Sequence, residues 1–238
     1  GANPVAVHEV SDARLLAPVG HAPSIRLFAP SASAADWSSL TEGRDAINEL
    51  SFAYLNSSIV VGTMSELMPC NYSDEIRFKP CLAAVVKSDG TYLPTEEADP
   101  YIVGVTLMNV FFAADVLRME QVRGTPTSRS HDVGIALGPA ITTPDELDDA
   151  TIQDLAGRRY NMNISAYVND DEVARFDTDD LAFTLTEAVA YASESAAVRA
   201  GDIIAICLGE PDLHVSLQSG DEVRLVNDRL GVLVNRVS

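Results

Sequence analysis

The amino-acid sequence predicts a β-rich α/β protein, built as a mixed β-roll with a small N-terminal lobe. Short apolar runs of strand length recur along the chain, and turn-forming residues separate them, as in 88–90, 169–171 and 219–221. Helical periodicity is scarce, and neither a glycine-rich phosphate-binding loop nor an internal repeat occurs. The predicted strands cover residues 59–61, 82–86, 101–108, 135–137, 162–168, 203–207, 222–226 and 230–234.

Helical character is confined to a few segments. Residues 41–50 fit a helix, and residues 96–100 fit a short helical turn. In residues 185–195, Leu185 and Val189 begin an apolar repeat at helical spacing. So few helices favour a β-rich roll over a doubly wound parallel sheet.

The pattern predicts two units along the chain. Within residues 1–51, prolines interrupt the short apolar runs, which indicates a small N-terminal lobe. Residues 52–238 contain the predicted strands and would form the β-roll, a catalytic type of domain.

Composition and charge exclude several classes of function. The chain has 238 residues, which is long enough to bury a hydrophobic core. Its 16 Lys and Arg residues against 35 Asp and Glu residues give a net charge of −19, which repels nucleic-acid phosphates and anionic lipid surfaces. The most apolar stretch, residues 101–116, is too short for a membrane span and predicts a buried strand. We therefore expect a small-molecule substrate, and neither nucleic acid nor a membrane as a partner.

The cysteines point to a reducing compartment. The chain has three cysteines, an odd number, at Cys70, Cys81 and Cys207, and none of them is in a CxxC motif. Neither a disulfide framework nor a structural zinc site is therefore predicted. The first residues also lack the basic and apolar regions of a secretory signal. These features together predict a cytoplasmic protein.

Seven short motifs occur in an order that is specific when they are taken together. They read RLLAP with PSIR, LAAVV, YIVG with LMN, LGP with TPDEL, GDIIA, SGDEV, and LGVLVNRV. By these motifs the chain resembles the fumarylacetoacetate hydrolase family over roughly residues 13–238. The resemblance implies a mixed β-roll, usually a homodimer, that hydrolyses, decarboxylates or tautomerises oxo-acids and β-dicarbonyls on a Mg²⁺ or Mn²⁺ ion.

The positions that hold this metal in the family carry other residues here. By the resemblance, the Glu-x-Glu pair corresponds to Lys79 and Cys81. The two aspartates correspond to Val110 and Leu27, and the water-activating histidine falls near Ala34. A hard divalent cation needs oxygen ligands, which ammonium, thiol and aliphatic side chains do not supply. We therefore expect neither the family's metal nor another cofactor.

Four residues are the candidate catalytic groups: Lys79, His131, Asp115 and Glu120. Lys79 would anchor or polarise a substrate oxygen, or act as an acid or base; the alternative is a lysine that extends out of a degenerate pocket or pairs with a nearby carboxylate. His131 stands at the position of a conserved family lysine and would act as a general acid or base, or else lie in an exposed loop. Asp115 and Glu120 would act as acid, base or orienting groups, with solvated helix-end acids as the alternative.

Further candidates would contact the substrate. Two of them are polar, and the others would line an apolar pocket, with ordinary strand pairing, loop exposure or core packing as the alternative for each. Covalent catalysis by a cysteine is disfavoured because no histidine is tied to either thiol by its spacing. The candidate contacts are Asn109, Arg129, Cys81, Val110, Leu27, Cys207 and Leu208.

The preferred hypothesis is a metal-independent cyclase or isomerase that acts by acid–base catalysis on an apolar β-dicarbonyl or polyketide-like intermediate. Bacterial natural-product biosynthesis is the expected setting, and part of the reason is analogy at the level of the fold. Two alternatives stay open. One is a catalytically silent family member that binds a ligand or partner, and the other is a metal-dependent hydrolase or decarboxylase of oxo-acids.

Overall fold

The structure is a computed structural model that describes residues 15–29, 50–68, 70–154, 157–209 and 213–238. Its main element is a seven-stranded mixed sheet with the strand order β2-β1-β12-β5-β6-β7-β3. In this sheet β1 runs parallel to β12 and β3 runs parallel to β7, whereas the other neighbours are antiparallel. The strands are β1 (Ile25–Phe28), β2 (Phe52–Leu55), β3 (Val60–Val61), β5 (Ile76–Val86), β6 (Ile102–Ala113), β7 (Gly134–Thr142) and β12 (Ile203–Cys207).

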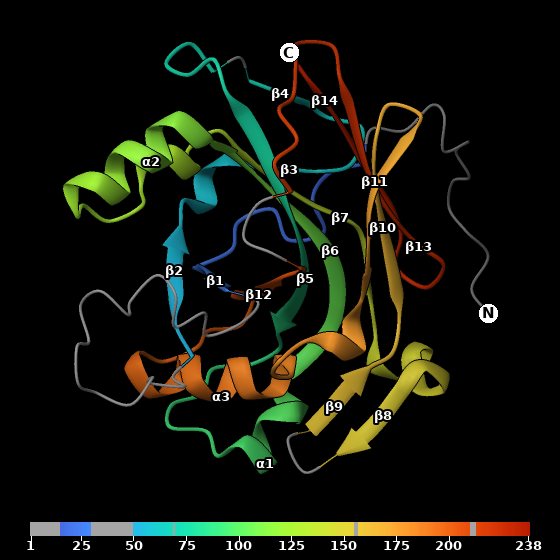
Figure 1. Ribbon diagram of the computed structural model, residues 1–238. Coiled ribbons are helices and arrows are strands. Elements are labelled where there is room, and N and C mark those ends of the chain that lie inside the picture. Colours follow the sequence, from blue (N-terminus) through green and yellow to red (C-terminus); the bar gives the residue numbers. More distant parts are fainter. Residues whose placement is uncertain (1–14, 30–49, 69, 155–156, 210–212) are drawn as a thin grey trace, which may run out of the picture.

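A second sheet has five strands in the order β11-β10-β13-β14-β4. Figure 1 shows it at the right of the molecule, beside the long central strands β5 and β6. The strands are β4 (Glu66–Leu67), β10 (Asn163–Val168), β11 (Asp171–Asp177), β13 (Glu222–Asn227) and β14 (Gly231–Val237). A separate two-stranded hairpin consists of β8 (Thr151–Asp154) and β9 (Gly157–Tyr160).

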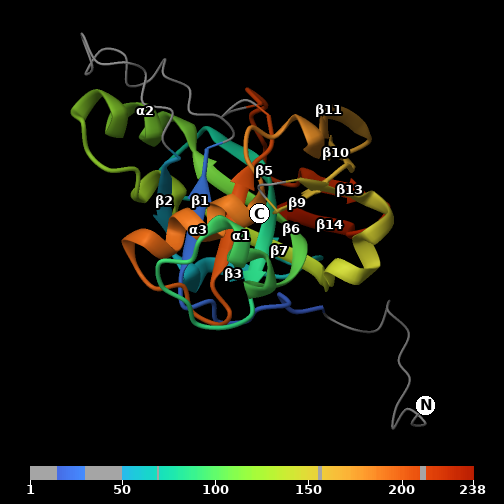
Figure 2. The same ribbon diagram turned by 90° about the horizontal axis from the view of Figure 1, so that it is seen from below.

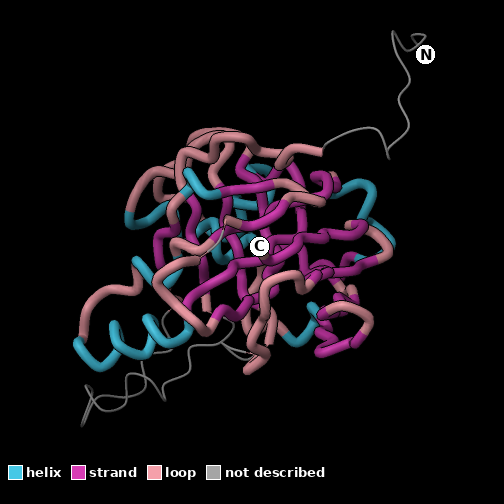
Figure 3. Tube along the Cα trace, turned by 90° about the horizontal axis from the view of Figure 1, so that it is seen from above, coloured by secondary structure: helices cyan, strands magenta, loops and turns pink. Residues whose placement is uncertain are grey.

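The helices α1 (Thr95–Ala98), α2 (Ala114–Arg123) and α3 (Leu185–Ser195) lie around the strands (Figure 3). Helix α3 begins at a capping box, in which Thr184 and Glu187 satisfy each other's backbone N–H groups. Helix α2 projects to one side of the molecule (Figure 2). No helix in these ranges is long and apolar enough to cross a membrane.

Two hydrophobic clusters lie on opposite faces of the seven-stranded sheet. Because side chains alternate along a strand, successive residues of β5 contribute to different clusters. The larger cluster joins the two sheets and α3, and includes Phe78, Leu82, Phe111, Ile164, Val189 and Leu225. The smaller cluster includes Ile25, Leu27, Cys81, Val110, Ala205 and Cys207.

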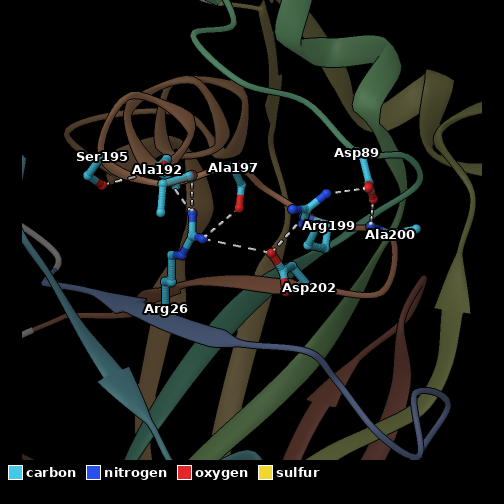
Figure 4. Close-up of polar contacts among 9 residues, drawn as sticks. Arg26, Asp89, Ala192, Ser195, Ala197, Arg199, Ala200 and Asp202 are labelled. Carbon is cyan, nitrogen blue, oxygen red and sulfur yellow. Dashed lines mark hydrogen bonds and ion pairs between the residues drawn. The ribbon is translucent and has the colours of Figure 1, made fainter.

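Arg26 ties β1 to the end of α3 (Figure 4). Its guanidinium group donates hydrogen bonds to the carbonyl oxygens of Ala192 at 2.9 Å and Ala197 at 3.2 Å, and lies 3.8 Å from the Asp202 carboxylate. The Ala192 carbonyl also accepts the backbone N–H of Ala196 at 3.5 Å, so Arg26 adds a further donor there, and a cation at this end of α3 complements the helix dipole. The side chains of Arg26 and Asp202 are only 3% and 1% exposed, which makes this a buried connection.

The structure confirms the β-rich α/β fold, and each predicted strand is found as all or part of a strand. The predicted helix at 185–195 is α3, and the turn at 96–100 overlaps α1. Almost all of the segment 41–50 lies outside the described residues. The patterns did not predict α2 or the strands β1, β2, β4, β8, β9 and β11.

The division into two units stays a prediction, because residues 1–14 and 30–49 are outside the described ranges. The described part of the predicted lobe includes β1, which lies between β2 and β12 in the main sheet.

Candidate functional site

Lys79 lies in the middle of β5, on the face that carries the smaller hydrophobic cluster. It is the register partner of Val110 on β6, and Cys81 follows it on the same face. Leu27 and Cys207 belong to the same cluster. Lys79, Cys81 and Val110 are thus neighbours on this face, whereas Leu27 lies two strands away from β5 and in line with Ala83 rather than Lys79.

These side chains do not fit a hard divalent cation. Carboxylate, carbonyl and water oxygens are the ligands of Mg²⁺, and similar ligands suit Mn²⁺. The sheet face around Lys79 offers one ammonium group, two thiols and aliphatic groups instead. Across the part of the chain that the structure describes, no group of three or more His, Cys, Asp or Glu residues could hold a metal ion. Ala34 lies outside that part.

Lys79 contacts an imidazole and an aromatic ring. Its Nζ lies 3.1 Å from Nε2 of His131 and 4.5 Å from the centre of the Phe112 ring. The Phe112 and His131 rings stack, with their centres 5.7 Å apart and an angle of 14° between their planes. An ammonium above an aromatic face is stabilised by the ring quadrupole. None of the described carboxylates lies within ion-pair distance of Lys79.

A chain of hydrogen bonds leads from Lys79 to Glu120. Ser130 Oγ lies 3.0 Å from Nδ1 of His131 and donates to Oε2 of Glu120 at 2.5 Å. Because an ammonium can only donate, Nε2 of His131 is the acceptor, and Nδ1 then carries the hydrogen that it shares with Ser130. The hydrogen bonds thus all run in one direction, from Lys79 through His131 and Ser130 to Glu120.

Burial keeps His131 uncharged. Loss of solvation, and secondly the positive charge of Lys79, lower the pKa of His131 to about 3. Its side chain is 6% exposed. A neutral imidazole holds the ammonium of Lys79 by a hydrogen bond and leaves its positive charge in place. A carboxylate at the same position would cancel that charge. The site consequently presents an unneutralised positive charge beside apolar side chains.

The lowered pKa of His131 predicts acid destabilisation. In the unfolded chain the imidazole takes up a proton near its usual pKa of about 6.5, whereas in the folded protein it does so only near 3. Stability is therefore lost as the pH falls between these two values. The free energy of unfolding should drop by about 2 kcal/mol more between pH ~7 and pH ~5 than it does in His131→Asn.

Urea unfolding at the two pH values measures this difference. His21→Asn is the matched control, because His21 is exposed, and it should retain the full drop. An equal pH dependence in wild type and His131→Asn would contradict a neutral buried imidazole.

A surface cleft opens beside His131. It has a volume of about 280 Å³ and is lined by Tyr54, Leu55, Asn56, Ser128, His131 and Asp132. Asn56 donates a hydrogen bond to Asp132 at 3.1 Å across part of this lining. His131 therefore contacts Lys79 on one side and borders a solvent-accessible cleft.

Other predicted site residues lie apart from Lys79, His131 and Glu120. Asp115 accepts hydrogen bonds from Ser73 and from the backbone of its own helix α2. Arg129 is exposed, and its guanidinium lies 4.6 Å from the centre of the Tyr72 ring. Asn109 and Leu208 lie on the sheet face opposite Lys79, toward the larger cluster, since strand residues alternate. We therefore leave these four residues out of the proposed site.

The sequence reasoning missed Ser130, Phe112 and the residues of the cleft other than His131. Alternation along β6 from Val110 places Phe112 on the face of Lys79, so that signal was available. Ser130 had no such signal, because its contact with Glu120 depends on how α2 packs against the turn 129–131.

Comparison with known sequences identifies relatives. The profile described as Fumarylacetoacetate (FAA) hydrolase C-terminal matches residues 31–238. The chain is 26% identical over 188 residues to oxaloacetate tautomerase FAHD2B, mitochondrial, of Homo sapiens. The matched region covers 76% of this chain and 56% of that protein. The chain is also 28% identical over 179 residues to an uncharacterized protein of Archaeoglobus fulgidus, and this matched region covers 75% of the chain and 65% of the relative. The chain thus spans little more than half the length of the human relative.

Solved structures share the fold. A 5-carboxymethyl-2-hydroxymuconate delta-isomerase from Mycobacterium smegmatis matches with a TM-score of 0.76 at 22% identity, over 96% of this chain and 83% of that one. A fumarylpyruvate hydrolase from Pseudomonas aeruginosa, in complex with Mn²⁺ and pyruvate, matches with a TM-score of 0.69 at 20% identity, over 91% and 89% of the two chains.

Proposed function

The chain belongs to the fumarylacetoacetate hydrolase family, and from this premise we propose that it is a metal-independent isomerase that interconverts the keto and enol forms of a β-dicarbonyl compound. The observation that carries the proposal is the ammonium of Lys79, held 3.1 Å from a neutral imidazole where the family would place a metal ligand. The names of relatives, an oxaloacetate tautomerase among them, support keto–enol chemistry.

Lys79 would stabilise the charge that develops on the substrate oxygen. When a proton leaves the carbon between two carbonyl groups, negative charge moves to a carbonyl oxygen. The ammonium meets that charge in a partly buried setting, where an electrostatic contact is stronger than in bulk solvent. In this role a side chain supplies the positive charge that metal-dependent members take from an ion.

His131 would accept the proton at Nε2 and return it from there, since that nitrogen becomes free when the Lys79 ammonium turns from it to the substrate oxygen. The charge of Lys79 is one cause of its lowered pKa, so an enolate bound to Lys79 offsets that charge and raises the proton affinity of the imidazole. Ser130 and Glu120 would position the ring through Nδ1, since their hydrogen bonds fix which nitrogen carries hydrogen.

The lining of the site favours a neutral, largely apolar substrate. Val110 and Cys81 are buried beside Lys79, Leu27 lies further along the same face, and the cleft adds Tyr54 and hydrogen-bonding groups. Ring closure through the same enol would use the same residues, so a polyketide-like intermediate of bacterial natural-product biosynthesis remains our proposed substrate class. A homodimer in the cytoplasm is the proposed setting.

An enol absorbance assay on chelator-treated protein tests this function. The protein should accelerate the keto–enol interconversion of an aryl-substituted β-diketone by about a hundredfold or more over buffer. Added Mg²⁺ or Mn²⁺ should leave the rate unchanged, because no proposed step involves a cation. Oxaloacetate serves as the comparison substrate and should react more slowly, since Lys79 can pair with one of its carboxylates while the other would lie against the apolar lining without an ion pair. A rate that appears only with added metal would overturn the proposal.

A further inference from the structure

Cys81 and Cys207 face each other in the interior, next to Lys79. They are register partners in the antiparallel pair of β5 and β12, and their Sγ atoms lie 4.0 Å apart. Both are free thiols, with side chains 0% and 5% exposed. Nothing in the proposed reaction needs two thiols at this place.

The hydrogen-bond pattern between β5 and β12 places the backbones of Cys81 and Cys207 close together. The backbone N–H of Leu208 donates to the carbonyl oxygen of Pro80 at 2.8 Å, so these two residues form a hydrogen-bonded pair. The next pair along the ladder, Cys207 with Cys81, is therefore a non-hydrogen-bonded pair. Such pairs have Cα atoms about 4.5 Å apart, with side chains closer than in the alternate pairs. This spacing lies inside the range of about 4.4–6.8 Å that disulfides span.

We propose that Cys81 and Cys207 are a modification site, a dithiol that hydrogen peroxide oxidises to an intramolecular disulfide. Rotation of the two side chains brings the Sγ atoms from contact distance to bonding distance with the strands in place. The proposal does not depend on the proposed enzymatic function.

Cys207 is the thiol that reacts first. It is the more exposed of the two, and the hydrogen bond from Cys81 lowers the pKa of Cys207, whereas burial raises the pKa of Cys81. The thiolate of Cys207 attacks one peroxide oxygen and becomes a sulfenic acid, and the other oxygen leaves as water. Sγ of Cys81 then attacks Sγ of Cys207 and displaces the second water. Two thiols lose two electrons and two protons, and one peroxide becomes two waters.

Oxidation changes the neighbourhood of Lys79. In the reduced protein the thiol of Cys81 can donate to the backbone carbonyl of Lys79, which lies 3.3 Å from Sγ. The disulfide has no S–H group, so that carbonyl loses a donor.

Alkylation and intact-mass measurement test the proposal. Native protein is treated with hydrogen peroxide, denatured and alkylated, with untreated protein as reference. The treated chain should have one alkylatable thiol in place of three and be lighter by two hydrogen atoms before alkylation. A peptide map should show the cross-link between Cys81 and Cys207, and dithiothreitol should restore all three thiols.

Single serine variants identify which thiols form the disulfide. Cys81→Ser and Cys207→Ser should each fail to form the internal cross-link, whereas Cys70→Ser, the matched control, should form it as wild type does. If a serine variant does not fold, the wild-type peptide map alone decides. The proposal is overturned if folded wild type and Cys70→Ser keep both internal thiols after peroxide treatment, or if the linked peptide contains Cys70.

Discussion

Lys79→Met should reduce the rate of keto–enol interconversion by about 10²–10⁴-fold. Methionine keeps much of the length and the apolar character of the lysine stem but removes the only charge in the cluster of Lys79, His131 and Phe112. Without it, negative charge on the substrate oxygen has no electrostatic partner at this site. The quantity to measure is kcat/KM in the chelator-treated enol assay.

Lys79→Arg is the matched control for charge. The guanidinium keeps the positive charge but spreads it over a larger planar group, which does not reproduce the point contact of the ammonium with His131 and the substrate oxygen, so part of the rate should return. The unfolding midpoints of both variants should be recorded, so that a loss of rate is separated from a loss of fold. A folded Lys79→Met protein with the wild-type rate would remove Lys79 from the mechanism, and the proposed function would then lack its main support.

Arg26→Met should lower the free energy of unfolding by about 3–5 kcal/mol. The variant removes one of the donors to the Ala192 carbonyl and the donor to the Ala197 carbonyl, and it leaves the carboxylate of Asp202 buried without a cation. Removing one partner of a buried pair costs more than the pair contributes, since the remaining charge stays desolvated. Urea unfolding at neutral pH measures the change.

Arg199→Met is the matched control in the same region (Figure 4). Arg199 pairs with Asp89 at 2.6 Å, but the two side chains are 59% and 58% exposed. Water solvates both groups when this pair is broken, so the variant should change stability far less than Arg26→Met. Equal effects of the two substitutions would show that burial does not set the strength of the Arg26 network.

Strand alternation predicted part of the site correctly. The residue pattern of β5 implies that Lys79 and Cys81 share a face, and the structure places both there with Val110 opposite Lys79. The same rule puts Asn109 on the other face from Val110, yet the family resemblance suggested a substrate contact for it. The register thus places Asn109 away from Lys79, and its contact with a substrate stays a prediction.

Contacts between distant segments were beyond the sequence patterns. Strand β1 is four residues long and contains an arginine, so its pattern is weak, and the partners that stabilise it lie near the C-terminus. The link from Ser130 to Glu120 likewise depends on the direction in which α2 leaves β6. Periodicity reports which residues share a face, but it carries no information about which distant elements meet.

The position of β12 has a consequence for how the chain reaches its native state. This strand lies between β1 and β5, although it follows both by more than a hundred residues. While the chain is being synthesised, the facing edges of β1 and β5 therefore have no native partner until β12 leaves the ribosome. Pairing across such sequence separations is slow because a long loop must close first. The apolar face that carries Lys79 is thus completed by a strand that is made more than a hundred residues after β5.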